Sequence, residues 1–257
     1  MICGNASEMF SAMHSDIYDY NYKRVSGDTV SPTQYITVEA EPGRSYVLRN
    51  TSHNLVTNCA LDMRWACANL LHFFSDTEDA EPLLMYNKNA ARFLTGTKWI
   101  GAYGAIAMPQ VWRCIRLLEG SITSRRAIIS MGDGSIHDIN RPACWSFVQF
   151  LASRKGLDMI VYQRSLLLSL MPYDCIVLTN MLQFVAKQCN IEPGRLRWSF
   201  GSLHMREDYK PVPNTLPRFK SLMLPDKVAR TAPLAYTWLQ HPVVADEPFR
   251  SHLMEPT

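Results

Sequence analysis

The sequence predicts an α+β or mixed α/β domain, and we expect an α+β fold in which helices flank a mixed β-sheet. Alternating, β-branched runs predict strands at residues 34–40, 127–131, 144–152, 157–164 and 196–204. Apolar residues at helical spacing predict helices at 7–20, 61–74, 109–119 and 174–190. The chain has 257 residues and no linker or repeat, so we expect a single domain spanning 1–257.

The elements of the first half are justified in order as follows. The strand at 34–40 should end at Pro42-Gly43, which is a turn signal. The helix at 61–74 is almost wholly apolar, which predicts that it is mostly buried. The helix at 109–119 should begin at Pro109, because proline is tolerated in a first helical turn.

The second half carries the clearest patterns. The four residues 153–156 (Ser-Arg-Lys-Gly) predict a hairpin between the strands on either side. We expect the next helix to begin at Asp174, with Pro172 just before it. Pro193-Gly194 then precedes the strand at 196–204, and the proline-rich tail from Glu207 shows no period.

Composition excludes several classes of function. A net charge of +3 without a run of basic residues argues against a nucleic-acid partner. No segment approaches about 18 consecutive apolar residues, so we expect no membrane span, and no secretory signal is visible. The seven cysteines are scattered without a Cys-x-x-Cys pair, which argues against disulfides and a metal site and favours free thiols in a reducing cytoplasm.

Cys144 and Arg164 are the most informative residues. A cysteine thiolate needs nearby positive charge, and guanidiniums such as those of Arg125, Arg126 and Arg164 bind phosphate in a bidentate manner. This combination indicates a nucleophile that acts on a phosphorylated small molecule. The alternative for Cys144 alone is a buried, inert cysteine.

Seven short motifs carry a family resemblance. In order they are Ser124-Arg125-Arg126, Pro142-Ala143-Cys144, Gln149-Phe150, Tyr162-Gln163-Arg164-Ser165, Pro172-Tyr173-Asp174, Pro193-Gly194 and Gly201-Ser202-Leu203-His204. Their order and spacing resemble the superfamily of thymidylate synthases and pyrimidine-nucleotide hydroxymethylases, with the core motifs inside 100–206. The resemblance implies a thymidylate-synthase-like fold and a homodimer that pairs sheet to sheet.

The resemblance also implies roles for individual residues. Cys144 would add to C6 of a pyrimidine and turn C5 into a nucleophile toward a one-carbon unit carried by 5,10-methylenetetrahydrofolate. Arg164 would bind the nucleotide phosphate and help to keep Cys144 ionised, and Ser165 would add a hydroxyl group. Gln163 belongs to the same substrate-binding motif.

Four more residues complete the expected phosphate and sugar contacts. Arg125 and Arg126 resemble arginines that the family supplies from the second subunit; a solvated basic turn is the alternative. Arg24 lies where the family keeps another phosphate-binding arginine. His204 resembles the histidine that contacts the sugar hydroxyl; a structural histidine is the alternative.

Asp174 carries the predicted choice of base. In this position thymidylate synthases have asparagine, and phage-type cytidylate hydroxymethylases have aspartate. A carboxyl group accepts from the exocyclic amino group of cytosine and, when protonated, can donate to N3, which requires that burial raise its pKa. A plain helix N-cap is the alternative.

The sequence departs from the family pattern at three places. Asn69 occupies the position of the family's general-base glutamate, while Tyr103 is kept. The family's aspartate that holds the pterin is absent from the segment shortly after the Arg-Ser motif. How folate would bind is therefore open. Arg206 replaces a tyrosine that touches the sugar, so the preference for ribose or deoxyribose stays open.

The resemblance therefore predicts a folate-dependent enzyme that forms 5-hydroxymethyl-cytidylate from CMP or dCMP, with Cys144, Asp174, Asn69 and Tyr103 at the catalytic centre. Its expected partners are a pyrimidine nucleoside monophosphate, folate and a second copy of the chain, without a metal, nucleic acid or membrane. One alternative is thymidylate-synthase-like methylation of a uridylate. The other is a nucleotide-binding pseudoenzyme, because Asn69 cannot carry a proton.

Overall fold

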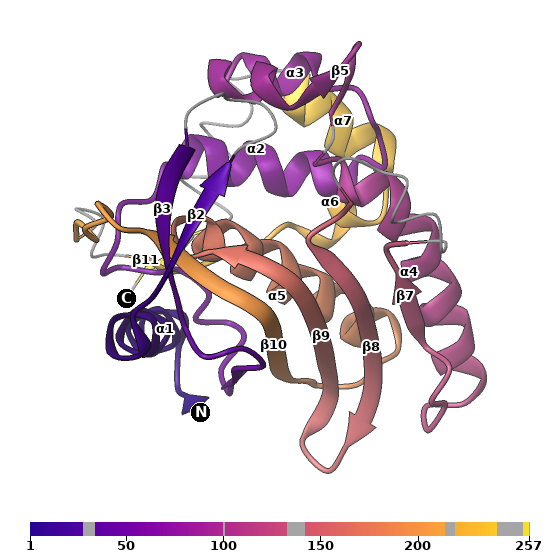
Figure 1. The fold of residues 1–257 in the computed structure, drawn as a ribbon. Coiled ribbons are helices and arrows are strands. Elements are labelled where there is room, and N and C mark those ends of the chain that lie inside the picture. The colour runs from indigo at the N-terminus through magenta and orange to yellow at the C-terminus, as the bar shows by residue number, and fades with distance from the viewer. Residues whose placement is uncertain (28–33, 100, 133–141, 214–218, 241–253, 257) are drawn as a thin grey trace.

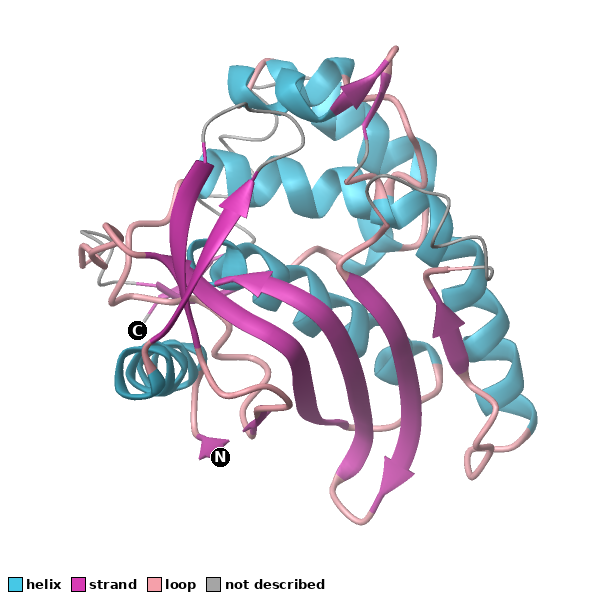
Figure 2. Ribbon diagram, viewed as in Figure 1, coloured by secondary structure: helices cyan, strands magenta, loops and turns pink. Residues whose placement is uncertain are grey.

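The computed structural model describes residues 1–27, 34–99, 101–132, 142–213, 219–240 and 254–256. Its helices and strands are arranged as a large curved sheet with helices against one side and at its ends (Figures 1 and 2). The helices are α1 (Ala6–Tyr20), α2 (Met63–Phe74), α3 (Glu81–Leu84), α4 (Tyr103–Gly120), α5 (Met171–Gln188), α6 (Asp226–Ala229) and α7 (Ala232–Gln240), with 3₁₀ turns η1 (Lys88–Phe93) and η3 (Leu168–Leu170).

Each of the five predicted runs is a strand, and the described residues form seven further strands that were not predicted. They are β1 (Ile2–Cys3), β2 (Tyr22–Gly27), β3 (Gln34–Glu39), β4 (Ser45–Leu48), β5 (Leu94–Thr95), β6 (Lys98–Trp99), β7 (Ile128–Ser130), β8 (Trp145–Ser153), β9 (Gly156–Leu167), β10 (Pro193–Arg206), β11 (Phe219–Leu222) and β12 (Met254–Pro256). The main sheet has the order β1-β4-β10-β9-β8-β7, and β3 joins the end of β10 and pairs with β2. These elements confirm the predicted mixed α+β architecture.

The centre of the sheet positions the motifs. β8 and β9 are antiparallel and meet at the predicted hairpin, where Ser153 pairs with Gly156. β9 and β10 are parallel, and Phe200 lies opposite Gln163 in their register. Because partners across a ladder share one face of the sheet, the motif residues of β9 and β10 become neighbours there.

One face of the sheet forms the core with α5. Met159, Val161, Trp198 and Phe200 are buried on this face, and Figure 1 shows α5 behind β9 and β10. The helical stretch Leu168–Gln188 has the length and hydropathy that a membrane span would need, but 72% of it is buried inside the protein. Packing against the sheet therefore accounts for its apolar composition.

The other face of β8, β9 and β10 is covered by no helix among the described residues (Figure 1). Tyr162 is 44% exposed, and Ile128 in the neighbouring β7 is 40% exposed. An open sheet face that carries large apolar side chains is a surface on which a partner can pack.

Two helix boundaries differ from the prediction. α4 begins at Tyr103, so Pro109 lies inside the helix and not in its first turn. The helix starts early because Gly104 lets it approach α2: a Cβ at Gly104 would lie 2.0 Å from the Phe73 carbonyl oxygen. Burial of Ala107, Met108 and Val111 then outweighs the backbone hydrogen bond lost at the proline.

The helix predicted at 174–190 also begins earlier, at Met171, so Pro172 lies in its first turn. The tail, which showed no period, contains α6, α7 and β11. These short elements are stabilised by contacts with distant residues, such as the buried Asn180 amide that donates to the Leu222 carbonyl oxygen at 2.8 Å. A local pattern does not contain such contacts.

Candidate active site

Cys144 is held in a turn that leads into β8. Its backbone N–H donates to the Tyr103 hydroxyl oxygen at 2.8 Å, and its carbonyl oxygen accepts from the Arg164 backbone N–H at 2.9 Å. Tyr103 is the first residue of α4, and Arg164 lies in β9. Three elements therefore fix the main chain of the cysteine, while its side chain keeps partial exposure.

The Arg164 side chain binds the same turn. Its Nε donates to the Ala143 carbonyl oxygen at 3.1 Å, and its Nη2 donates to the Pro142 carbonyl oxygen at 2.6 Å. The same Nη2 lies 4.0 Å from the Cys144 Sγ. Among the described residues, the two N–H groups of Nη1 have no such partner, so they can receive an anion.

The electrostatics of Cys144 result from opposing influences. Burial is the largest and raises the pKa of the thiol; the Tyr103 hydroxyl and the Arg164 guanidinium lower it, and the Asp174 carboxylate raises it further. The net direction is upward. Arg164 thus favours the thiolate as expected, but burial outweighs it in the single chain.

Gln163 is fully buried and its amide has a fixed orientation. Its Oε1 accepts from the Trp198 indole N–H at 3.0 Å, and an indole nitrogen can only donate. Its Nε2 therefore faces the other way and donates to the Asp174 Oδ2 at 3.1 Å and to the Ser165 carbonyl oxygen at 3.0 Å. Trp198 thereby determines which kind of group Gln163 presents to Asp174.

Asp174 is an acid with a shifted titration. Burial raises its pKa to about 6, and the Gln163 amide and the Trp145 indole partly oppose this effect. The simple N-cap interpretation of Asp174 is wrong, because Leu170 is the N-cap of α5 and has no side-chain capping bond. Asp174 lies within the first turn, where its carboxyl group is bonded to Gln163 instead.

Asn69 lies on the face of α2 that is directed toward this cluster. It is half-buried and shares a stripe with Trp65 and Phe73 at i, i+4 spacing. The Phe73 ring packs against Trp145 with centroids 5.9 Å apart. Asn69 forms no side-chain hydrogen bond with another residue that the structure describes, so its amide is available to order water.

His204 lies farther along β10, beside an ion pair. It is opposite Glu39 of β3, and its Nδ1 lies 3.3 Å from the Ser202 hydroxyl oxygen. Burial lowers the pKa of His204, and Glu39 opposes this change. The Arg24 Nε lies 2.9 Å from the Glu39 Oε1, so the structure gives Arg24 a carboxylate partner and not an open site.

Arg125 and Arg126 are exposed and lie outside this cluster. Their turn precedes β7, where the Arg125 carbonyl oxygen accepts from the Gln149 side chain at 2.8 Å and the Arg126 N–H donates to the Ser124 hydroxyl oxygen at 3.3 Å. Neither guanidinium forms an ion pair with a described residue. Arg141, which directly precedes the Pro142-Ala143-Cys144 motif, falls outside the described residues.

The helix starts beside Asp174 present an apolar surface on which a flat ring could lie. Leu170 is 49% exposed, and Tyr173 and Trp65 are half-buried. The Tyr173 hydroxyl oxygen accepts from the Asp62 N–H at 3.2 Å, which joins the start of α5 to the start of α2. These three side chains are apolar or aromatic, and none of them is an acid.

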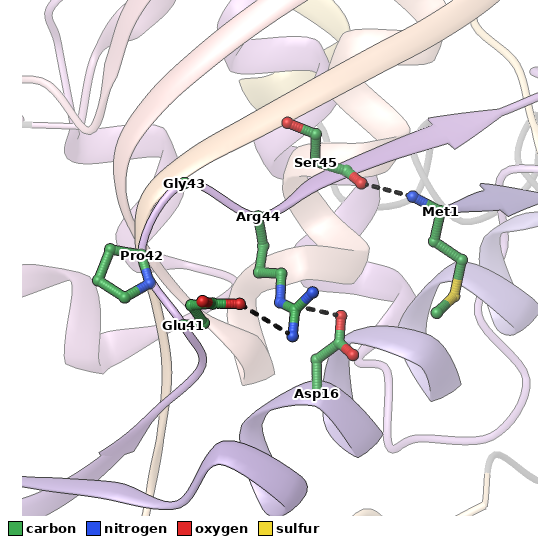
Figure 3. Close-up of a pocket in the computed structure, with 7 residues that line it drawn as sticks. All are labelled: Met1, Asp16, Glu41, Pro42, Gly43, Arg44 and Ser45. Atoms are coloured by element: carbon green, nitrogen blue, oxygen red, sulfur yellow. Dashed lines mark hydrogen bonds and ion pairs between the residues drawn. The ribbon is translucent and has the colours of Figure 1, made fainter.

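The remaining features to consider are a charged hollow and possible metal-binding clusters. A hollow of about 580 Å³ near the amino terminus is lined by Asp16, Glu41 and Arg44, whose charges pair with one another (Figure 3). In the part of the chain that the structure describes, no cluster of His, Cys, Asp or Glu side chains could hold a metal ion. The groups described near Cys144 include a thiol, a carboxyl group and a guanidinium.

Comparison with known proteins agrees with this arrangement. The family model described as "Thymidylate synthase" matches residues 9–226, which is most of the chain. The chain belongs to the thymidylate synthase family. This result confirms the resemblance inferred from the seven motifs, and thymidylate synthases use 5,10-methylenetetrahydrofolate as the one-carbon donor.

Individual thymidylate synthases are distant relatives. The protein of that name from Vesicomyosocius okutanii is 28% identical over 127 residues, which cover 48% of each chain. Those from Buchnera aphidicola of Schizaphis graminum and of Acyrthosiphon pisum (strain Tuc7) are 26% identical over 102 residues and 25% identical over 129 residues. These alignments cover 39% of each chain in the first case, and 46% of this chain and 49% of the relative in the second, so this chain spans about half the length of these thymidylate synthases or less.

The structure thus brings together Cys144, Tyr103, Gln163, Arg164 and Asp174, and the Ser165 main chain. Sequence reasoning missed two residues of this part of the thymidylate synthase fold. Trp198 orients Gln163, and it could be recognised only through the strand register. Trp145, which follows Cys144 directly, is in van der Waals range of the cluster, and its position next to the cysteine was the available signal.

Proposed function

We propose that this member of the thymidylate synthase family transfers a one-carbon unit to C5 of a cytidine monophosphate and forms 5-hydroxymethyl-cytidylate. The observation that carries the proposal is the fixed contact from the Gln163 Nε2 to the Asp174 Oδ2. It commits one carboxyl oxygen as an acceptor and leaves Oδ1 for the ligand. The bound base must then be complementary to Oδ1.

The edge of cytosine complements such an oxygen. Its exocyclic amino group donates to an ionised Oδ1, and its N3 accepts from a protonated one. A pKa of about 6 makes both forms of Asp174 accessible near neutral pH. Uracil presents a carbonyl oxygen at the same place, and an ionised Oδ1 would repel it.

The other residues supply the remaining steps. In the nucleotide complex the Cys144 thiolate adds to C6, which places the electron density at C5, and departure of the thiolate later restores the ring. The free Nη1 of Arg164 binds the phosphate, and the rest of that guanidinium keeps the nucleophile in place. Asn69 and the Tyr103 hydroxyl hold water, which accepts the proton that leaves C5.

The one-carbon donor of this reaction would be 5,10-methylenetetrahydrofolate, as in the family. When bound, it supplies carbon at the oxidation level of formaldehyde. Trp65, Leu170 and Tyr173 would hold its flat ring. Addition of water at the new carbon gives the hydroxymethyl product, and hydride would give methyl instead.

A homodimer forms part of the proposal. The uncovered face of β8, β9 and β10, with Tyr162 44% exposed, offers a surface for a second copy. The exposed Arg125 and Arg126 lie at the β7 edge of this sheet. From a second copy, they would reach the phosphate that Arg164 binds, which explains two guanidiniums without an ion pair in one chain.

The alternative activity is methylation of a uridylate. The relatives, which are thymidylate synthases, favour it, whereas Asp174 opposes it. The deciding experiment supplies CMP, dCMP, UMP and dUMP side by side with 5,10-methylenetetrahydrofolate and identifies the products by mass. A hydroxymethyl-cytidylate supports the proposal, and a methylated uridylate as the main product overturns it.

A binding protein without catalysis is the remaining possibility. Exchange of the C5 hydrogen with solvent separates it from an enzyme, because exchange needs Cys144 but no folate. Exchange by the wild type and its absence in Cys144→Ser would identify an enzyme. Tight nucleotide binding without exchange would identify a pseudoenzyme.

A further inference from the structure

Trp145 carries an unexplained polar atom next to the proposed base-binding acid. Its side chain is 2% exposed, and its indole Nε1 is buried without a hydrogen-bond partner in the described structure. A buried N–H without a partner costs free energy, so proteins rarely keep one without a reason. The neighbourhood of this atom indicates the reason.

The ring of Trp145 is fixed by its surroundings. It packs on the Tyr103 ring with centroids 5.1 Å apart and on Phe73 with centroids 5.9 Å apart. In the antiparallel ladder it lies directly opposite Gln163, so both side chains share one face of the sheet. The indole is therefore held in a defined orientation beside the amide that binds Asp174.

The indole N–H lies near enough to Asp174 to act on it, although the two groups do not reach full hydrogen-bond geometry. It lowers the pKa of that carboxyl group, as the Gln163 amide does, and both favour the ionised form. The other titratable groups close to this carboxylate are the Cys144 and Cys175 thiols and the Tyr103 hydroxyl, whose pKa values it raises. When neutral, these thiols and this hydroxyl carry no charge that acts on Asp174. The N–H groups of Gln163 and Trp145 are then the influences that oppose the effect of burial on its pKa.

We propose that Trp145 is a positioning residue for base recognition, whose indole N–H bonds the Asp174 carboxylate when a cytidine monophosphate is bound. This inference rests on the proposed function. Gln163 and Trp145 would then hold the ionised carboxylate from two sides, and its remaining acceptor direction meets the exocyclic amino group. A carboxylate held in this way rejects a carbonyl group, so Trp145 contributes to selection of cytosine over uracil.

The test removes the N–H and keeps the shape. Replacement of Trp145 by 3-benzothienylalanine, an isostere with sulfur in place of the N–H, preserves the packing, and Trp145→Phe is the simpler variant. Trp112→Phe is the matched control, because Trp112 lies in α4 and packs on Phe184 of α5, and neither residue belongs to the candidate site. The acidic limb of the pH profile of kcat/KM for CMP is measured for the wild type and for these three variants.

We expect the acidic limb of the isostere to move to higher pH by about 0.5–1 unit, since loss of one hydrogen bond to a charge disfavours the ionised acid. Its preference for CMP over UMP should fall at least about threefold, and the control should match the wild type. An isostere whose acidic limb and base preference equal those of the wild type overturns the inference. Loss of activity in Trp145→Phe alone would show that only packing matters, and would overturn it as well.

A binding measurement separates this inference from the proposed function. Calorimetry with Cys144→Ser protein gives the pH dependence of affinity for CMP and for UMP, with and without the isostere. If UMP binds better than CMP in the tryptophan protein, the proposed function fails on its own. If the isostere leaves the pH dependence of the preferred nucleotide unchanged, the role of Trp145 fails whichever base is bound.

Discussion

The Gln163 amide donates to the Asp174 carboxylate at 3.1 Å, and it can only donate there because Trp198 occupies its carbonyl oxygen. This contact joins β9 to α5 and determines what Asp174 can offer a ligand. A carboxylate keeps one oxygen as an acceptor, whereas an asparagine would accept from Gln163 and present its NH₂ group. Under the proposed function, Asp174 would therefore recognise one functional group of the base.

Asp174→Asn should move the preference from cytidylate toward uridylate. Each buried polar mismatch costs roughly 1–3 kcal/mol, and about 1.4 kcal/mol is tenfold in rate. The ratio of kcat/KM for CMP over UMP should thus fall by about one to two orders of magnitude. A folded variant with an unchanged ratio would place base recognition elsewhere.

The stability of the same variant has a defined dependence on pH. The folded pKa of Asp174, about 6, lies above the ordinary value of 3.8 for an aspartic acid, so protonation stabilises the fold. This stabilisation is complete below the unfolded pKa and is lost as the pH rises through 6. Relative to the wild type, Asp174→Asn should therefore have a higher Tm at pH 8 than at pH 4.5. Thermal melts at both pH values check this, and the opposite order would show that Asp174 is ionised at low pH.

Cys144→Ser should abolish turnover and leave nucleotide binding nearly intact. A serine hydroxyl is a much weaker nucleophile without a dedicated base, so kcat should fall at least about 100-fold, which corresponds to ~2.7 kcal/mol. Steady-state rates and calorimetry with CMP measure the two properties. Retention of more than about a tenth of the wild-type rate would remove Cys144 from the mechanism.

Alkylation of Cys144 should become faster in Asp174→Asn. The ionised carboxylate raises the pKa of the thiol, so its removal increases the thiolate fraction. The rate with iodoacetamide at pH 8 should rise about two- to tenfold, and the difference should shrink below pH 6, where Asp174 is protonated in the wild type. Cys189 is the other partly exposed thiol, so both proteins carry Cys189→Ser. Equal rates at pH 8 would show that the Asp174 carboxylate does not influence the pKa of Cys144.

A shared phosphate site should allow complementation between inactive subunits. Arg125→Ala and Arg164→Ala proteins, mixed and refolded together, form heterodimers in which one of the two sites has both arginines. About a quarter of the wild-type activity is expected from a statistical mixture, since half of the dimers are mixed and each has one complete site. Cys144→Ser mixed with Arg164→Ala is the control, because both residues belong to the site of one chain, so no mixed dimer has a complete site. No recovery in the first mixture would contradict a shared site.

The fold could be predicted from local patterns where the patterns were strong. The strands of the centre and the hairpin at 153–156 follow alternation that any sheet face imposes, and the structure confirms them. The start of α4 could not be predicted, because Tyr103 and Gly104 are helical only through contact with α2. The same holds for the tail, whose short helices depend on partners such as Asn180.

The candidate site was predictable in its residue types but not in its connections. Cys144, Gln163, Arg164 and Asp174 were named from motifs, and the structure places them together. The bonds from Arg164 to the Pro142 and Ala143 carbonyl oxygens are not encoded in any motif, because they require the turn to fold over β9. Arg24 was expected to meet phosphate, and its ion pair with Glu39 became visible only with the pairing of β2, β3 and β10.

The parallel pairing of β9 with β10 has a consequence for the folding of the protein. Parallel neighbours need a crossover, here α5, so Gln163 meets Trp198 only after the whole segment between them has formed. Contacts between residues far apart in sequence form late and cooperatively. Under the proposed function, recognition of the base would thus be a property of the finished sheet, and a nascent chain that lacks β10 would carry Cys144 without the contact that orients Gln163.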